Sequence, residues 1–109
     1  MTVSRSQTAK SLQGPLGRVV ASRRADLLDV LHRRGVTNVR VFGSVARGDD
    51  EPDSDVDLLV DFPPRTSLFT ILRLQDELEE MLGAKVDLVS DSGLLARIRT
   101  RVERDLIAL

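Results

Sequence analysis

The sequence lacks several residue types, and each absence excludes a class of protein. Its 109 residues include no cysteine, tryptophan or tyrosine and only three phenylalanines. Without cysteine there are no disulfides and no thiolate-ligated zinc, which fits a cytoplasmic protein. With so few aromatic rings, a base-stacking surface for nucleic acid is not expected. No apolar run approaches the roughly 20 residues that cross a bilayer, and Met1–Gly14 has no apolar segment typical of a secretory signal. We therefore expect no membrane partner.

What the sequence does contain is an uneven distribution of charge. The formal net charge is −1, but residues 49–61 hold seven acidic side chains and no basic one, whereas residues 1–48 hold nine basic and two acidic. The chain is 41% hydrophobic and 30% charged, so it can bury a core, and its length suits one domain. The acidic block is the feature that needs an explanation.

Hydrophobic periodicity and turn residues predict one α/β domain over residues 15–109, preceded by a flexible tail over residues 1–14. The predicted helices cover residues 16–34, 67–82 and 93–101, and the predicted strands cover residues 38–42, 55–61, 85–90 and 106–109. Residues 43–54 are predicted to form a loop. In the second helix Phe69 and the leucines are expected in the core, and His32 is expected at the surface. This order of elements indicates a small mixed sheet.

Two carboxylates of the acidic block lie on a predicted strand. Side chains alternate along a strand, so Asp55 and Asp57 share one face and leave Val56 and Leu58 to the other. The third strand places Asp87 in the same way. If the two strands are neighbours, the three carboxylates converge opposite the core and repel one another. Oxygen-ligated divalent cations such as Mg²⁺ stabilise such clusters.

The other acids of the block have simpler interpretations. Asp49, Asp50, Glu51 and Asp53 are expected to be solvated loop charges, and Asp61 has no assigned role. The run that starts at Asp53 resembles an EF-hand loop, but Leu58 stands where glycine is required. Likewise, Gly43–Gly48 matches half of a phosphate-binding P-loop, but Asp49 and Asp50 follow where lysine and serine or threonine are needed. Both of these motifs are excluded.

A glycine-serine pair precedes the acidic strand and completes a pattern. Gly43 and Ser44 follow a predicted strand, and ten residues separate Ser44 from Asp55. Glycine allows close approach of the backbone, and a serine hydroxyl with neighbouring amides can hold phosphate oxygens. Arg47 adds a fork-shaped phosphate donor. The four basic residues Arg97, Arg99, Arg101 and Arg104 are expected to form a solvated helix face.

The pattern Gly43-Ser44-x10-Asp55-x-Asp57, with Asp87 on a later strand, resembles the signature of the DNA polymerase β nucleotidyltransferase superfamily. The fuller string from Gly43 to Val60 is similar to that of its minimal nucleotidyltransferase (MNT) family. The resemblance covers residues 16–109 and implies a nucleotidyltransferase-like α/β (α+β) fold, a small mixed sheet with helices packed on one face.

The resemblance also implies an activity and a set of roles. Asp55 and Asp57 would bind two Mg²⁺ ions, Asp87 would complete the site, and Gly43 and Ser44 would hold the triphosphate of ATP, the substrate. Family members often act as antitoxins that transfer AMP to a tyrosine of a HEPN-domain ribonuclease toxin. The motif is complete here, which implies an active adenylyltransferase with a HEPN toxin as partner.

Three alternatives remain open at this point. The chain could neutralise a partner by binding alone, without chemistry. It could modify a small molecule of the aminoglycoside type, although 109 residues leave little room for a second substrate pocket. Direct binding of nucleic acid is the least supported, because the acidic block repels phosphate and aromatic residues are scarce.

Overall fold

The computed structural model describes residues 11–93 and 96–109. The elements are α1 (Pro15–Ser22), α2 (Arg24–Arg33), β1 (Thr37–Phe42), α3 (Gly43–Arg47), β2 (Val56–Asp61), α4 (Leu68–Leu82), β3 (Val86–Ser90), the 3-10 turn η1 (Asp91–Gly93), α5 (Ala96–Glu103) and β4 (Ile107–Ala108). The four predicted strands are confirmed, with small changes at their ends. The third predicted helix is present as α5, whereas Gly93, its predicted first residue, belongs to η1.

The four strands form one mixed sheet in the order β3-β2-β1-β4. Strand β2 runs parallel to β3, with Asp57 opposite Asp87, and antiparallel to β1, with Asp57 opposite Phe42. Strand β4 pairs with the other side of β1 and forms an edge. The predicted small mixed sheet is confirmed, and β2 and β3 are the neighbours that converging carboxylates require.

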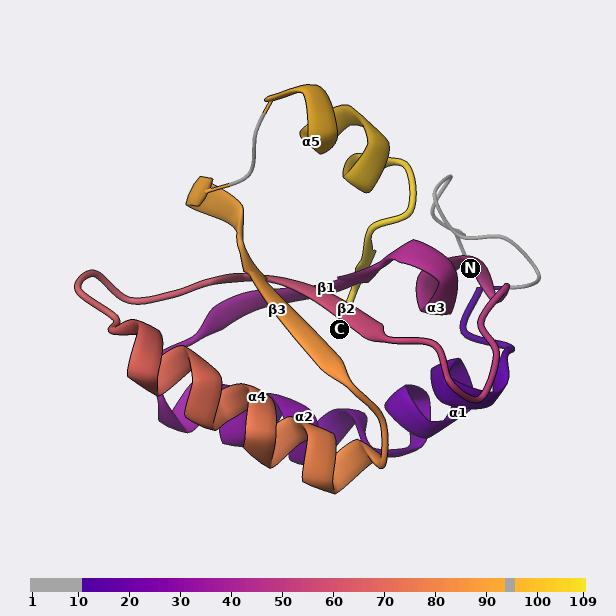
Figure 1. The fold of residues 1–109 in the computed structure, drawn as a ribbon, viewed down its shortest axis with the longest axis horizontal. Coiled ribbons are helices and arrows are strands. Elements are labelled where there is room, and N and C mark those ends of the chain that lie inside the picture. The colour runs from indigo at the N-terminus through magenta and orange to yellow at the C-terminus, as the bar shows by residue number, and fades with distance from the viewer. Residues whose placement is uncertain (1–10, 94–95) are drawn as a thin grey trace.

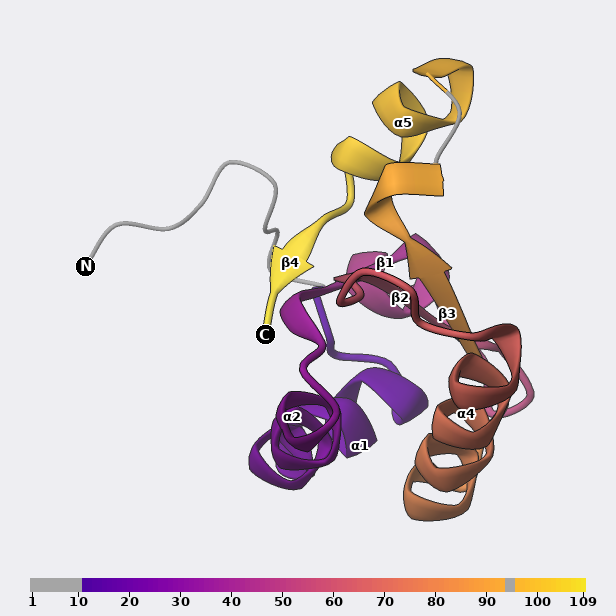
Figure 2. The ribbon, with the colours of Figure 1, turned by 90° about the vertical axis from the view of Figure 1, so that its left-hand side faces the viewer.

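The core lies between one face of the sheet and three helices. Val56, Leu58 and Val60 alternate along β2 and are buried on this face. Helices α1, α2 and α4 cover it, whereas α5 stands on the other side of the sheet (Figure 1; Figure 2). The face of β2 that carries Asp57 therefore points away from the main helical layer.

The predicted first helix is in fact two helices. The backbone angles of Arg23 (φ −105°, ψ 14°) are not helical, so α1 ends before this residue and α2 begins after it. Residues 21–26 are all exposed, so packing against the core does not stabilise a continuous helix through this segment. The break lets both Val20 of α1 and Leu27 of α2 reach the core.

Helix α4 has the predicted ends, and only some of its residues that were expected in the core are buried. The hydroxyl of Ser67 accepts from the amide of Thr70 (3.1 Å) at its start, and Gly83 ends it with φ 69°. The buried side chains are Leu74, Leu78 and Leu82. The expectation that Phe69 lies in the core is wrong, because Leu68, Phe69 and Leu72 are 70%, 69% and 48% exposed. Core contact begins only at Ile71, which is partly buried.

The predicted tail falls mainly on residues 1–10, which lie outside the described residues. Leu12 packs partly buried against the core, and Gly14 is buried. Residues 11–14 thus join the domain. None of the helices in the described residues is long and apolar enough to span a membrane.

Candidate active site

The structure places the three predicted carboxylates at one end of the β2–β3 pair. Asp57 and Asp87 lie opposite each other in the parallel register, and Asp55 directly precedes β2. Asp57 is partly buried, while Asp55 and Asp87 are exposed. The predicted shared face is therefore confirmed for Asp57 and Asp87, because their strands pair with these two residues opposite each other.

Electrostatics show that these acids influence one another. Burial first, and then the negative charges of Asp87 and Asp55, raise the pKa of Asp57 from 3.8 to about 6, while the positive charge of Arg47 acts in the opposite direction. A carboxyl group whose ionised form is disfavoured by burial and by two neighbouring carboxylates favours a nearby cation. Asp57 is thus the electrostatic centre of the cluster.

Gly43 brings the backbone of α3 against Asp57. Its φ is +74°, a value that favours glycine, and a Cβ built at Gly43 would lie 2.5 Å from Oδ2 of Asp57. Gly43 and Ser44 begin α3, so the prediction of a plain loop over residues 43–54 is wrong at its start. The short helix ends at Gly48 (φ 81°), and the amide of Asp49 donates to the carbonyl of Ser44 (3.0 Å).

Arg47 lies close to the cluster but is held by two other acids. It donates to Oδ2 of Asp105 (2.9 Å) and to Oδ2 of Asp49 (3.2 Å). The hydrogen bond to Asp105 is the main cause that raises the pKa of Arg47 above its ordinary value. These contacts tie α3 to the segment after α5. A phosphate that recruits Arg47 would have to compete with both carboxylates.

Asp50 is not the solvated loop charge that the sequence predicts. It is only 7% exposed, and its Oδ2 accepts from the amides of Leu16 (2.7 Å) and Gly17 (3.4 Å) at the start of α1. Its Oδ1 is buried and has no hydrogen-bond partner in the described structure. A Cβ at Gly14 would lie 1.8 Å from this Oδ1. Asp50 therefore caps α1 from a distant part of the chain and fixes the segment between α3 and β2.

We expect Asp50→Ala to lower the free energy of unfolding by about 1 to 2 kcal/mol, the range for loss of an N-cap. Chemical denaturation of the two proteins measures this difference. Asp53→Ala is the matched control, because the Asp53 side chain is exposed and makes no hydrogen bond or ion pair with the described residues. Equal losses in the two variants would contradict the capping role of Asp50.

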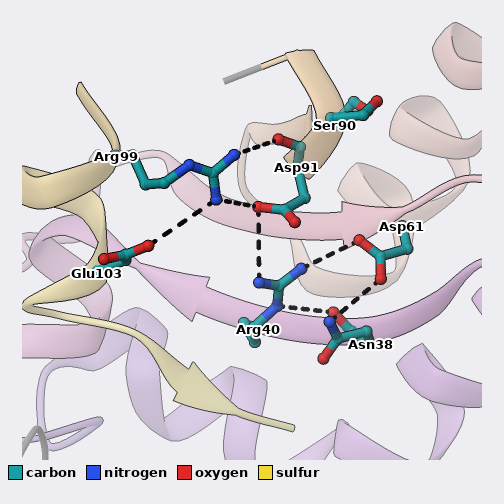
Figure 3. Close-up of polar contacts among 8 residues, drawn as sticks. Asn38, Arg40, Asp61, Ser90, Asp91, Arg99 and Glu103 are labelled. Atoms are coloured by element: carbon teal, nitrogen blue, oxygen red, sulfur yellow. Dashed lines mark hydrogen bonds and ion pairs between the residues drawn. The ribbon is translucent and has the colours of Figure 1, made fainter. Parts of the chain in front are cut away.

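A second polar network joins the far end of the sheet to α5 (Figure 3). Arg40 of β1, which is 15% exposed, reaches Asp61 (3.4 Å) and Asp91 (3.9 Å). Arg99 of α5 donates to the carboxylate and to the carbonyl of Asp91, each at 2.8 Å. The expectation of a solvated basic face is thus wrong for Arg99, and Asp61, unassigned from sequence, is a partner of Arg40. The side chains of Arg97 and Arg101 lie outside the described structure.

The acids of the cluster fit a magnesium ion by their chemistry. Mg²⁺ prefers oxygen ligands and is commonly held by one or two carboxylates together with substrate phosphates and water. Asp57, with Asp55 before it and Asp87 opposite, supplies such oxygens. Within residues 11–93 and 96–109, no group of three or more acidic, histidine or cysteine side chains is arranged to hold a metal ion by itself. The two-ion site therefore stays a prediction.

Comparison with known proteins gives the family. The nucleotidyltransferase domain family matches residues 25–108. Protein adenylyltransferase MntA of Thermococcus cleftensis is 43% identical over 79 residues, which cover 72% of this chain and 80% of that protein. A solved minimal nucleotidyltransferase structure is also 43% identical, with a TM-score of 0.75 over 91% of this chain and 96% of that chain.

A more distant structure shares the fold alone. It belongs to a toxin-antitoxin complex with AMP-PNP, is 20% identical, and has a TM-score of 0.69 over 77% of this chain and 69% of that chain. The acids at the start of β2, the approach of Gly43 to Asp57 and the sequence matches agree. This chain belongs to the nucleotidyltransferase domain family, and within that family it is a minimal nucleotidyltransferase.

Proposed function

We propose that the chain is a Mg²⁺-dependent protein adenylyltransferase that transfers AMP from ATP to a hydroxyl group. The acceptor we propose is a tyrosine of a HEPN-domain toxin, so that the chain acts as an antitoxin. The observation that carries the proposal is the packing of Gly43 against Asp57, with Asp87 in register opposite it. The 43% identity with a protein adenylyltransferase supports the choice of AMP and of a protein acceptor.

The proposed reaction is an in-line displacement at the α-phosphorus of ATP. The acceptor oxygen attacks, a new P–O bond forms, the bond to the oxygen that bridges to the β-phosphate breaks, and pyrophosphate leaves. Bound Mg²⁺ would stabilise negative charge on the attacking and leaving oxygens. The proton of the acceptor hydroxyl passes to a carboxylate, for which Asp87 is exposed and available.

The other residues of the site would position the nucleotide. Gly43 and Ser44 would lie along the triphosphate, since Gly43 has no side chain between α3 and Asp57. Asp55 and Asp57 would hold the metal ions, and a cation bound there would offset the burial and the neighbouring charges that raise the pKa of Asp57. Holding ATP and acceptor together supplies the orientation that such displacements need.

Two labelled forms of ATP test the proposal. The purified chain is incubated with Mg²⁺, a HEPN-domain protein as the candidate acceptor, and ATP labelled on either the α- or the γ-phosphate. We expect label on the partner from α-labelled ATP only, a mass increase of one or more AMP units on a tyrosine, and loss of the partner's ribonuclease activity. Full inhibition of the partner without ATP, and without added mass, would instead support an antitoxin that acts by binding alone.

A further inference from the structure

Strand β3, which carries Asp87, is an edge strand. It pairs with β2 on one side only, where the carbonyl of Lys85 accepts from the amide of Val56 (2.8 Å). In a parallel pair the amides alternate in direction, so those of Val86 and Leu88, on either side of Asp87, point away from β2. An edge strand normally leaves such amides to water or to a neighbouring chain.

Helix α4 supplies an acceptor for each of these two amides. The amide of Val86 donates to Oε2 of Glu79 (3.0 Å), and the amide of Leu88 donates to Oε1 of Gln75 (3.0 Å). Gln75 and Glu79 are four residues apart and so lie on one side of the helix. Both side chains are partly buried. They therefore bracket Asp87 along the strand.

The side chain of Asp87 has no such support of its own. It is exposed and makes no hydrogen bond or ion pair with the part of the chain that the structure describes. The position of its carboxylate relative to Asp57 therefore depends on the backbone of β3. That backbone is held by the ladder to β2 on one side and by Gln75 and Glu79 on the other.

We propose that Gln75 and Glu79 are positioning residues that fix Asp87 for metal and nucleotide binding, acting through the backbone of β3. The proposal rests on the proposed function, because it assigns Asp87 to that site. The alternative is that the two side chains only protect the edge of the sheet. A role in positioning predicts an effect on metal-dependent binding, whereas protection of the edge predicts an effect on stability alone.

Matched variants separate the two roles. Glu79→Met and Gln75→Met remove the acceptors at similar size, while Glu79→Gln and Gln75→Glu keep an acceptor oxygen. Glu80→Met is the control, because the Glu80 side chain is exposed on the same helix and makes no hydrogen bond or ion pair with the described residues. All measurements are made well below the unfolding temperature of each variant.

The first readout is hydrogen exchange in the metal-free protein. We expect the amide of Val86 to exchange at least about 10-fold faster in Glu79→Met, and the amide of Leu88 to do so in Gln75→Met. Exchange should stay at the wild-type rate in Glu80→Met, Glu79→Gln and Gln75→Glu. Unchanged exchange in Glu79→Met and Gln75→Met would overturn the proposal, because the hydrogen bonds would then not hold the strand.

The second readout is calorimetric binding of ATP in the presence of Mg²⁺. We expect affinity to fall about 3- to 10-fold in Glu79→Met and Gln75→Met, and to be restored in the variants that keep an acceptor. If the Met variants bind ATP as tightly as wild type although their amides exchange faster, the two side chains only protect the edge of the sheet, and the proposal is overturned. If wild type binds ATP with Mg²⁺ but transfers no AMP, only the proposed function fails. If wild type binds no ATP, both fail.

Discussion

Asp57→Asn is expected to abolish AMP transfer and, at the same time, to stabilise the metal-free protein. The loss of transfer, at least about 1,000-fold, follows from the proposed role of Asp57, because a charged metal ligand contributes several kcal/mol in the transition state. The gain in stability follows from the raised pKa of Asp57, which shows that its charge is unfavourable in the folded state without a cation.

The pH dependence gives the sign of the stability effect. The carboxyl group binds its proton more tightly in the folded chain, with a pKa of about 6, than at its ordinary value of 3.8. Between these values the folded state holds more protons, so the metal-free protein loses stability as pH rises from about 4 to about 6 and stays less stable above. Because Asp57 is only half-buried, we expect a loss of about 1 to 2 kcal/mol.

Denaturation of the metal-free protein between pH 4 and 7.5 measures this effect. Asp57→Asn should be more stable than wild type at pH 7 and should lack the decline between pH 4 and 6. Asp53→Asn is the control, since the Asp53 side chain is exposed and makes no hydrogen bond or ion pair with the described residues. A decline that persists in Asp57→Asn would show that another group causes it. Added Mg²⁺ should raise the stability of wild type and have little effect on Asp57→Asn.

Gly43→Ala is expected to be the second severe change. A methyl group there would lie 2.5 Å from Oδ2 of Asp57, closer than real Cβ atoms approach, and the φ of +74° adds backbone strain of about 1 kcal/mol. The carboxylate of Asp57 must therefore move, and we expect AMP transfer to fall at least about 100-fold, since a misplacement of about 1 Å has effects of this size.

Gly83→Ala separates the two causes of this loss. Gly83 has nearly the same φ, +69°, but nothing lies within 4 Å of a Cβ built there. Both alanine variants should lose stability from backbone strain, and only Gly43→Ala should lose transfer. Measured rates of AMP transfer and unfolding free energies decide this. Equal transfer in the two variants would contradict the close packing of α3 against Asp57.

Much of the fold followed from the sequence because the signals are local. The alternating residues of β2 predicted its strand and the side of the sheet that carries Asp57, and the pairing with β3 places Asp87 opposite Asp57. The ends of α4 followed from Ser67 and Gly83, which act through hydrogen bonds and backbone angles within a few residues. His32 is exposed, as predicted.

The missed features depend on contacts between distant residues. Asp50 bonds to Leu16, 34 residues earlier, so nothing near Asp50 distinguishes it from the exposed Asp49 and Asp53. The acceptors Gln75 and Glu79 are ordinary helix residues until β3 is placed beside them. These contacts depend on how the elements pack.

The exposure of Phe69 has the same explanation. Helical spacing predicts which residues share a side of α4, but not where along the helix contact with the sheet begins. Phe69 precedes Ile71, the first residue that packs partly buried against the core, and so remains 69% exposed. Arg99 is a similar case. Its sequence neighbours predict a solvated helix charge, and only the fold brings the carboxylate of Asp91 in η1 within 2.8 Å of its guanidinium group.

The acids around Asp57 are proposed to form a metal-dependent nucleotide site. Calorimetric titration of ATP into the chain, with Mg²⁺ and then with a chelator, tests it without knowledge of the acceptor. We predict that wild type binds ATP at least about 10-fold more tightly with Mg²⁺, and that Asp55→Asn and Asp57→Asn lose this Mg²⁺-dependent gain while remaining folded. If Asp57→Asn binds ATP as tightly as wild type and responds to Mg²⁺ in the same way, the proposed metal-dependent nucleotide site around Asp57 is contradicted.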